Sequence, residues 1–459
     1  MDQISGSFRD PSGFLFTENG MLYRMINESY RENYSILMNS GLYEELTEKN
    51  LLIPHEEEPS GRFAHEKSFK TIKPRKTDFI SYPYEWCPGQ LKDAALATLE
   101  IQRAALGRGM SLKDGSAYNI QFDCGRPVLI DTLSFEKYIE GSPWTAYGQF
   151  CRHFLAPLAL MCLKDVRLGQ LSRIYIDGIP LDLAAGILPK KSLLNFPILT
   201  HIHIHAKSQK HFRNKAVGKP ERKMSRFSLL GLIDSLESCI KKLCWKPLGT
   251  EWSDYYSGTN YSEAALNFKK DFITNILNER NTATVWDLGA NTGVFSRIAS
   301  GRGIKTAAFD IDPAAVEKNY SETKRNNEKN ILPLILDLTN PSPAAGWDNT
   351  ERMSFKERGP CGIAMALALI HHLAIGNNLP FSKIAFFFAE ICGALIIEFI
   401  PKTDSQVIRM LSSREDIFGG YSKENFEVEF KKHFEITTSA GIADSERTIY
   451  FMEKKQASC

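Results

Sequence analysis

Residues 285–293 read Val285-Trp286-Asp287-Leu288-Gly289-Ala290-Asn291-Thr292-Gly293, and this stretch decides the fold of the C-terminal part of the chain. An apolar run ends in a glycine-rich turn, and a helical pattern follows. Gly289 permits a tight turn at the end of a strand, and Gly293 permits the backbone to approach a ligand closely. Free N–H groups at the start of the helix favour oxygen atoms or a carboxylate. The stretch therefore predicts a strand, a ligand-binding turn and a helix.

The residues on both sides of this turn alternate between strand and helix patterns. Apolar strands are predicted at 284–288, 305–309, 332–336, 362–367 and 394–400, and helices at 262–279, 293–300, 313–325 and 380–392. Continuous apolar strands that alternate with helices are typical of a parallel sheet covered on both faces. We therefore expect an α/β domain at the C-terminus.

Three of these strands are associated with an acidic residue. Asp287 lies at the end of the first, Asp310 follows the second and Asp337 follows the third. An acid after the second strand can accept hydrogen bonds from both hydroxyls of a ribose, and one after the third is placed to meet an adenine amino group. Each acid alone can instead cap a helix, and for Asp312 before Pro313 capping is the better interpretation. Together, the three acids indicate a nucleoside-bearing ligand.

The order Asp287-x-Gly289-x-Asn291-x-Gly293, with an acid after each of the next two strands, resembles class I S-adenosylmethionine-dependent methyltransferases. The resemblance covers roughly residues 255–455 and implies a Rossmann-like fold with S-adenosyl-L-methionine as the cofactor. A dinucleotide site requires Gly-x-Gly-x-x-Gly, which this sequence does not supply.

The resemblance also implies a role for each residue of the pattern. Asp310 is expected on the ribose and Asp337 at the adenine. The methionine part of the cofactor is expected to contact Asp287, Gly289, Ala290, Asn291 and Gly293.

The fourth strand leads into Ala368-Leu369-Ile370-His371-His372. Methyltransferases that act on amino nitrogens often carry an Asn/Asp-Pro-Pro-aromatic motif here, and it is absent. His371 or His372 is a candidate catalytic base for an oxygen or acid substrate, because imidazole titrates near neutrality. The alternative is a histidine that caps or packs at the strand end. The sequence does not favour one of the two histidines over the other.

Three segments resemble nodulation-type methyltransferases and their bacterial relatives more narrowly. They are 287–300 (DLGANTGVFSRIAS), 368–381 (ALIHHLAIGNNLPF) and 397–411 (IEFIPKTDSQVIRML). This resemblance does not identify the methyl acceptor, so a small molecule, a glycan and a protein all remain open as substrates.

Residues 110–135 hold a second pattern. Asp114 and Asn119 are five positions apart, and Asp131 follows 12 positions later. This pattern resembles the catalytic loop and metal-binding acid of protein-kinase-like phosphotransferases. In that family the first acid orients the acceptor hydroxyl, whereas the asparagine and the second acid hold magnesium. The resemblance therefore implies ATP and Mg as cofactors of the N-terminal region.

The N-terminal pattern also departs from that family. A serine stands where the usual histidine would be, and Asp131-Thr132-Leu133 replaces Asp-Phe-Gly. Neither a glycine-rich phosphate loop nor a VAIK-like lysine is identified. A second interpretation is therefore a kinase-like lobe that has been kept as a substrate-binding or structural module.

The remaining patterns predict the organisation of the N-terminal half. We expect hairpins at 13–26, around Asn19-Gly20, and at 119–130, and helices at 27–52, 90–109, 143–165 and 227–243. We expect four parts: a small α+β N-terminal lobe (1–85), a mostly helical kinase-like lobe (86–205), a basic linker and helix (206–255) and an S-adenosylmethionine-binding methyltransferase domain (256–459).

Two further N-terminal features each allow two interpretations. His201, His203 and His205 alternate and on a strand would share one face, where they could bind a metal; a polar strand face is the more frequent outcome, and we expect no metal. The stretch 207–226 carries eight basic residues and one acid. It is either a patch for an anionic partner or a solvated linker, and the linker is favoured.

The overall composition is that of a globular protein. The 459 residues include 56 Lys and Arg and 54 Asp and Glu, so a net charge of +2 gives no strong field toward nucleic acid or an anionic membrane. The nine cysteines form no Cys-x-x-Cys pair, and neither a signal peptide nor a membrane span is visible, so we expect a cytoplasmic protein.

Three functions are consistent with these patterns. The first is a methyltransferase whose N-terminal region binds or positions the substrate. The second is a bifunctional protein with an additional ATP- and Mg-dependent phosphotransferase. The third is a non-catalytic module that binds a nucleoside cofactor.

Overall fold

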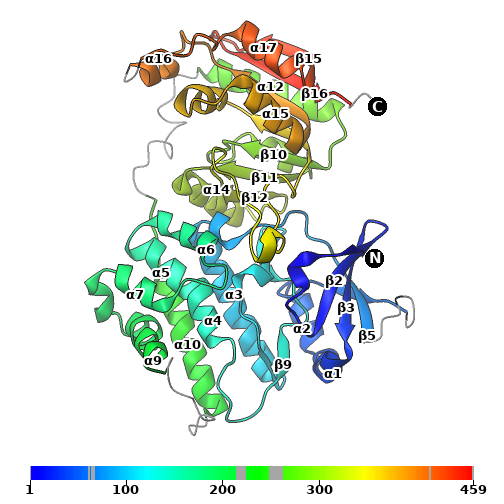
Figure 1. The fold of residues 1–459 in the computed structure, drawn as a ribbon, viewed down its shortest axis with the longest axis vertical. Helices are drawn as coiled ribbons and strands as arrows, with labels where there is room; N and C mark the ends of the chain where they lie inside the picture. Colours follow the sequence, from blue (N-terminus) through cyan, green and yellow to red (C-terminus); the bar gives the residue numbers. More distant parts are fainter. Residues whose placement is uncertain are drawn as a thin grey trace. The chain divides into compact units, whose positions relative to one another are not determined.

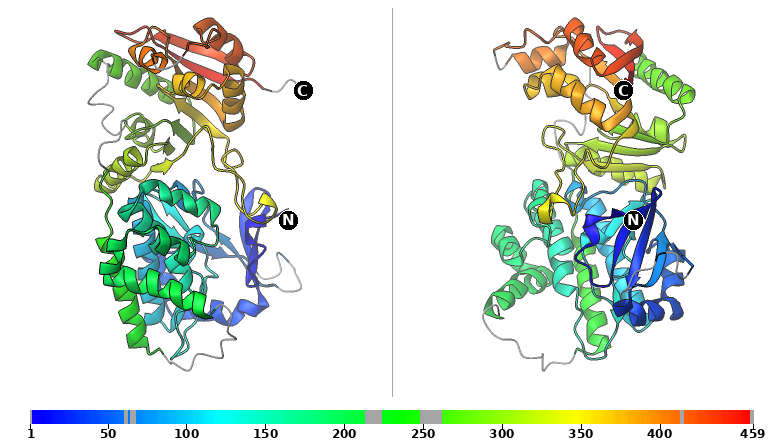
Figure 2. Two further views of the ribbon diagram at one scale, coloured as in Figure 1. Left: turned by 60° about the vertical axis from the view of Figure 1, so that its left-hand side comes forward. Right: turned by 45° about the vertical axis from the view of Figure 1, so that its right-hand side comes forward.

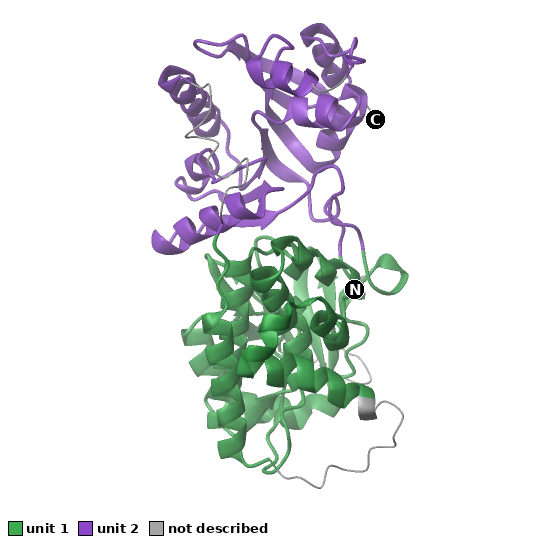
Figure 3. Ribbon diagram, turned by 90° about the vertical axis from the view of Figure 1, so that its left-hand side faces the viewer, with its two compact units in different colours: residues 1–246, 345–352 green, residues 247–344, 353–459 purple. Residues whose placement is uncertain are grey.

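The computed structural model describes residues 2–59, 63, 68–212, 224–247, 262–412 and 415–456. The chain divides into two compact units (Figure 3): unit 1 comprises residues 1–246 and 345–352, and unit 2 comprises residues 247–344 and 353–459. The domain boundary predicted at residue 256 lies outside the described residues, as does most of the basic stretch, residues 213–223.

Unit 1 begins with a five-stranded antiparallel sheet in the order β1-β2-β3-β5-β4 (Figure 1). Its strands are β1 (Asp2–Gln3), β2 (Gly13–Glu18), β3 (Met21–Asn27), β4 (His55–Glu57) and β5 (Ser68–Pro74). Asn19 and Gly20 join β2 to β3 with φ angles of 51° and 74°, as the favoured two-residue hairpin turn requires. The hairpin predicted at 13–26 is confirmed.

The single helix predicted at 27–52 is wrong. A 3₁₀ turn at Glu28–Tyr30 leads into α1 (Arg31–Asn39), and a separate helix, α2 (Leu42–Glu48), follows. Gly41 lies between them with a φ of 76°, which is a left-handed conformation that a continuing α-helix does not contain.

Helices form most of the rest of unit 1. The helix predicted at 90–109 is confirmed as α3 (Pro88–Gly107), and the hairpin at 119–130 is confirmed as β7 (Ile120–Asp123) paired with β8 (Arg126–Leu129). A second short sheet pairs β6 (Met110–Leu112) with β9 (Phe135–Lys137). The helices that follow are α4 (Tyr147–Phe150), α5 (Ala156–Leu163), α6 (Leu171–Ile174), α7 (Leu181–Ile187), α8 (Phe196–Ile198), α9 (His205–Phe212) and α10 (Arg226–Lys242).

Unit 2 contains a seven-stranded sheet, which Figures 1 and 2 show from several sides. Its strand order is β12-β11-β10-β13-β14-β16-β15. The strands are β10 (Thr284–Leu288), β11 (Lys305–Asp310), β12 (Ile331–Ile335), β13 (Cys361–Ala366), β14 (Cys392–Phe399), β15 (Phe434–Gly441) and β16 (Thr448–Lys454). The first five run parallel to one another, whereas β16 is antiparallel to both β14 and β15. The chain order reverses between β10 and β13, so a ligand crevice is expected at their carboxyl ends.

Helices pack on both faces of this sheet, because successive strand residues point to opposite sides. On one face Val285 lies in a core cluster with Ile273 of α12 (Glu263–Glu279) and Ala299 of α13 (Ser296–Ser300). On the other face the ring of Trp286 packs against Phe355, with centroids 4.8 Å apart, and Phe355 in turn stacks on Phe387 of α15, with centroids 6.3 Å apart. The remaining helices are α14 (Pro313–Arg325), α15 (Phe381–Ile391), α16 (Ser405–Leu411) and α17 (Lys423–Lys431).

The Rossmann-like α/β fold expected for the C-terminal part is therefore confirmed, with two additional antiparallel strands, β15 and β16, after the last predicted one. Within the part of the chain that the structure describes, no helix combines the length and the apolar character needed to span a membrane.

Candidate functional site

The turn after β10 has a left-handed backbone at three positions. The φ angles of Gly289, Asn291 and Gly293 are 81°, 50° and 82°, which glycine adopts freely and asparagine tolerates. The N–H groups of Gly289 and Ala290 both donate to the carbonyl of Phe309, at 2.9 Å each. These two bonds hold the turn against the end of β11.

Ala290 and Gly293 face protein. Ala290 is buried in a small core cluster with Ala308. A Cβ atom at position 293 would lie 2.6 Å from Asn319 Nδ2 and 2.8 Å from an Arg297 guanidinium nitrogen. Packing against α13 and α14 is thus a sufficient reason for this glycine, and it differs from the predicted reason, which was close approach to a ligand.

Two buried carboxylates lie beside the turn. Asp287 Oδ2 accepts a hydrogen bond from Ser296 Oγ at 2.6 Å. Asp310 accepts the backbone N–H of Asn291 at 2.7 Å and that of Asp312 at 2.9 Å. Burial raises the pKa of Asp287 to about 7 and that of Asp310 to about 6, and these hydrogen bonds oppose the shift.

The other two acids of the pattern have different environments. Asp337 is half-buried, and its Oδ1 accepts the N–H of Thr339 at 2.8 Å and the hydroxyl of Thr339 at 2.6 Å. Asp312 accepts the N–H of Ala314 at 2.9 Å and caps α14, as predicted.

A cavity of about 260 Å³ lies at the carboxyl ends of β10 to β13. The predicted residues that line it are Asp287, Gly289, Asn291, Asp310 and Asp337. Apolar side chains, among them Leu266, Phe295, Leu338 and Leu369, complete much of its wall. Acceptor oxygens at a few points of a largely apolar cavity suit a ligand with hydroxyl and amino donors and an apolar body.

The two histidines after β13 differ in their surroundings. Their rings pack with centroids 4.1 Å apart, but His371 is only 1% exposed and is absent from the cavity wall, which includes His372. Burial lowers the pKa of His371 well below its ordinary value, so this ring resists protonation. Of the two candidate bases, His372 is the one placed to meet a ligand in the cavity.

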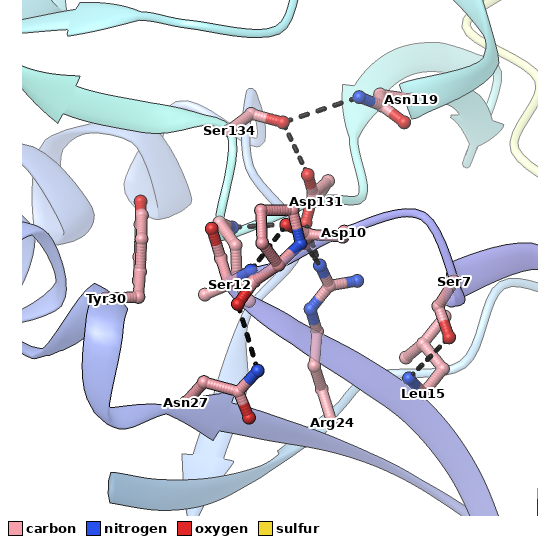
Figure 4. Close-up of polar contacts among 12 residues, drawn as sticks. Ser7, Asp10, Ser12, Leu15, Arg24, Asn27, Tyr30, Asn119, Asp131 and Ser134 are labelled. Carbon is pink, nitrogen blue, oxygen red and sulfur yellow. Dashed lines mark hydrogen bonds and ion pairs between the residues drawn. The ribbon is translucent and has the colours of Figure 1, made fainter. Parts of the chain in front are cut away.

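Unit 1 brings two residues of the N-terminal pattern to one bridging serine (Figure 4). Ser134 Oγ donates to Asp131 Oδ2 at 2.6 Å and accepts from Asn119 Nδ2 at 3.4 Å. Burial raises the pKa of Asp114, which a hydrogen bond from the Ser116 N–H opposes, and the charge of Asp131 adds to the increase. The three side chains of the pattern therefore belong to one polar cluster.

Arg24 on β3 joins this cluster and was not identified from the sequence. Its guanidinium lies 2.5 Å from Asp10 Oδ2 and 3.0 Å from Asp131 Oδ1 (Figure 4). Arg24 is 8% exposed and Asp131 is half-buried, so water has limited access to their ion pair. Among the described residues, no group of three or more His, Cys, Asp or Glu side chains has the arrangement of a metal site.

The strand predicted for His201, His203 and His205 is wrong. The backbone is helical here: Asn195 caps α8, and Pro197 lies in the first turn of that helix. The helical segment continues as a π-helical turn at Leu199–Ile204 and then as α9. His201 bonds to the hydroxyls of Tyr147 (2.8 Å) and Ser235 (3.0 Å), whereas His203 bonds to that of Ser192 (2.9 Å). His203 therefore has a different partner from the other two histidines, whereas the rings of His201 and His205 both pack against Tyr147, at 5.9 Å and 4.9 Å between centroids.

A comparison with known proteins places the whole chain in a family. The nodulation protein NoeA of Rhizobium meliloti (strain 1021) is 31% identical over 463 residues, which cover 99% of this chain and 96% of the relative.

The chain belongs to the NoeA family of nodulation proteins.

No protein-family model matches this NoeA-family chain. Less than half of its length is similar in structure to nearly whole methyltransferases. The N-methyltransferase NodS of Bradyrhizobium japonicum WM9 is 10% identical with a TM-score of 0.31, over 42% of this chain and 99% of NodS. Magnesium protoporphyrin IX methyltransferase of Synechocystis PCC 6803 is 14% identical with a TM-score of 0.31, over 44% of this chain and 93% of the enzyme.

Lys269 is the charged cavity residue of this NoeA-family chain that the sequence patterns did not single out. It lies on α12, lines the cavity and is 1% exposed. Its position was the available signal, because it is four residues after Ala265 and four before Ile273, both of which are buried. A lysine on the apolar face of a helix indicates a buried charge with a structural or functional role.

Proposed function

We propose that unit 2 binds S-adenosyl-L-methionine in the cavity and transfers its methyl group to an acceptor. One observation carries this proposal: three carboxylates at the carboxyl ends of consecutive strands, Asp287, Asp310 and Asp337, all line one cavity at the point where the strand order reverses. A single acid at the end of a strand can be explained by helix capping. Three acids in the wall of one cavity instead indicate a ligand with several hydrogen-bond donors.

The residues present fit this cofactor. Asp310 offers carboxylate oxygens to the ribose hydroxyls, and the half-buried Asp337 offers acceptors to the adenine amino group. Asp287 and the turn at Gly289 and Asn291 are placed to hold the methionine part. The bound cofactor supplies an activated methyl group. The work of the chain is to orient the acceptor toward it and to keep water out of the apolar parts of the cavity.

His372 is the candidate for accepting a proton from the acceptor. It lies in the cavity wall, whereas His371 is packed behind it. An imidazole at this place suits a hydroxyl or acid acceptor, which must lose a proton for methyl transfer. The acceptor class remains a small molecule, a glycan or a protein.

Calorimetric titration with S-adenosylmethionine and with S-adenosylhomocysteine tests the binding step. We expect both to bind the wild-type protein and Asp310→Ala to bind neither measurably. Formation of S-adenosylhomocysteine from S-adenosylmethionine, when an extract of the source organism supplies the acceptor, tests transfer. Binding without any transfer would favour the alternative, a non-catalytic cofactor-binding module. If the folded wild-type protein does not bind either nucleoside, the proposal is wrong.

A second candidate function concerns unit 1, where the proximity of Asp114, Asn119 and Asp131 favours an ATP- and Mg-dependent phosphotransferase site. The ion pair between Arg24 and Asp131 would have to open, or to accept the phosphates as an additional partner, before a cation could use this carboxylate. Titration with ATP in the presence of Mg tests this candidate: binding that is lost in Asp131→Ala favours it, and no binding at millimolar ATP excludes it.

A further inference from the structure

The cavity of unit 2 contains one buried ammonium group. Lys269 extends from α12 into the cavity wall beside Asp287 and Phe295, and its Nζ lies 4.9 Å from the centre of the Phe295 ring. Burial lowers the pKa of Lys269, while the charge of Glu398 opposes this effect. A lysine is rarely this deeply buried unless its charge has partners.

Lys269 belongs to an alternating series of buried charges. Asp404 Oδ2 lies 2.7 Å from Arg447 Nε, and Arg447 in turn lies 3.2 Å from Glu398 Oε1. Glu398 Oε2 then lies 3.1 Å from Lys269 Nζ and also accepts the N–H of Ala368 at 2.9 Å. Because Glu398 is shared between two cations and a backbone donor, it does not serve Lys269 alone. The series therefore brings a cation to the wall of the cavity.

A cation and a carboxyl group thus line the same cavity. Lys269 carries the positive charge, and Asp287, whose Oδ2 is held by Ser296, supplies the acid. An α-amino acid group carries the complementary pair, an ammonium and a carboxylate on one carbon atom. Ion pairing in a water-poor cavity is strong only when both charges have a partner, so the cavity suits a zwitterionic group better than either charge alone.

We propose that Lys269 binds the α-carboxylate of the methionine part of the cofactor and so selects ligands that carry this carboxylate. This inference rests on the proposed function, because it assigns a role within the same cavity. Lys269 acts on binding and on the placement of the cofactor and takes no part in the chemistry.

Paired ligands test this assignment. S-adenosylmethionine and its decarboxylated form differ only in the α-carboxylate, and 5′-methylthioadenosine lacks the whole amino acid end. Each is titrated by calorimetry into the wild-type protein, Lys269→Met and Lys270→Met. Lys270 is the matched control, because it is the next residue on α12 and does not line the cavity. Thermal melting checks that each variant is folded.

We expect Lys269→Met to weaken the binding of S-adenosylmethionine by roughly 10- to 150-fold, since a hydrogen bond to a charged group contributes about 1.5–3 kcal/mol and each 1.4 kcal/mol is about tenfold. The dissociation constants of this variant for decarboxylated S-adenosylmethionine and 5′-methylthioadenosine should differ from those of the wild type by less than about threefold. Lys270→Met should bind all three like the wild type. If Lys269→Met does not fold, Lys269→Gln replaces it, because the amide can still donate to Glu398 without the charge.

Two results would overturn the assignment. If Lys269→Met binds all three ligands with equally reduced affinity, Lys269 only supports the shape of the cavity. If Lys269→Met binds S-adenosylmethionine as tightly as the wild type does, Lys269 does not contact the carboxylate. Failure of the proposed function is distinguishable from both, because the wild-type protein itself would then bind none of the three ligands.

Discussion

Replacing Asp310 by asparagine should separate cofactor binding from folding. The side chain keeps its size, but one carboxylate oxygen becomes an amide nitrogen. The two oxygens of Asp310 accept the N–H groups of Asn291 and Asp312, so one of these donors loses its partner. That loss costs about 1–3 kcal/mol. Removal of a buried negative charge offsets part of the cost, since burial raises the pKa of this carboxyl to about 6. The variant should therefore remain folded at room temperature.

The effect on binding should be larger than the effect on folding. In the proposed complex, the Asp310 carboxylate accepts the ribose hydroxyls, and hydrogen bonds to a charged group contribute about 1.5–3 kcal/mol. The dissociation constant for S-adenosylmethionine should therefore rise about 10- to 150-fold. The comparison is made at pH 8, where the wild-type carboxyl is ionised because its pKa is about 6.

The assay is calorimetric titration of the wild type, Asp310→Asn and Asp312→Asn. Asp312 is the matched control: it lies two residues away, is 5% exposed and caps α14, but it does not line the cavity. Asp312→Asn should bind S-adenosylmethionine within about threefold of the wild type, because asparagine caps helices as well as aspartate does. If folded Asp310→Asn binds as tightly as the wild type, or if both variants lose affinity equally, the assignment of Asp310 to the ribose is refuted.

Three further predictions concern stability and turnover. Gly293→Ala should lower the free energy of unfolding by about 2–4 kcal/mol, because position 293 has a left-handed φ and a Cβ atom there would overlap with Asn319. Gly303 has the same φ but open space around it, so Gly303→Ala should lower the free energy of unfolding by only about 1–2 kcal/mol. Equal losses of the two variants in denaturant titrations would contradict the packing argument. The pKa of Asp287 is about 7 in the folded state and about 3.9 in the unfolded state, so the folded state holds more protons between these pH values. The free energy of unfolding should therefore fall as the pH rises from about 4 to 7, by up to about 1.4 kcal/mol per pH unit. Asp287→Asn should flatten this slope, and equal slopes in the two proteins would contradict the prediction. His372→Ala should reduce kcat at least about tenfold while the Kd for S-adenosylmethionine changes little, and an unchanged kcat would remove this histidine from the mechanism.

Local sequence patterns were sufficient for most of the secondary structure of unit 2. The apolar runs of the five parallel strands and the helical spacing between them are repeats over a few residues, and the backbone responds to them locally. The turn after β10 was also predictable, because Gly289 and Asn291 are residues that accept a positive φ. Two predictions from local patterns were wrong. The left-handed Gly41 divides the helix predicted at 27–52, and a helix that begins after Asn195 replaces the strand predicted for the three histidines.

The contacts that define the candidate sites depend on residues far apart in the chain. Arg24 meets Asp131 only because the tertiary structure brings β3 to the segment after β8 within unit 1, and no short-range pattern relates the two positions. The difference between His371 and His372 likewise follows from which ring faces the cavity, since the two are neighbours in sequence.

The α/β character of the C-terminal part, its glycine-rich turn and the three acids at strand ends can be read from the amino-acid order, because hydrophobic periodicity and turn chemistry act over a few residues. That Lys269 shares the cavity with those acids becomes visible only once the chain is folded. Its partner Glu398 is 129 positions away, and a buried lysine is stable only where packing brings such a partner within hydrogen-bond distance.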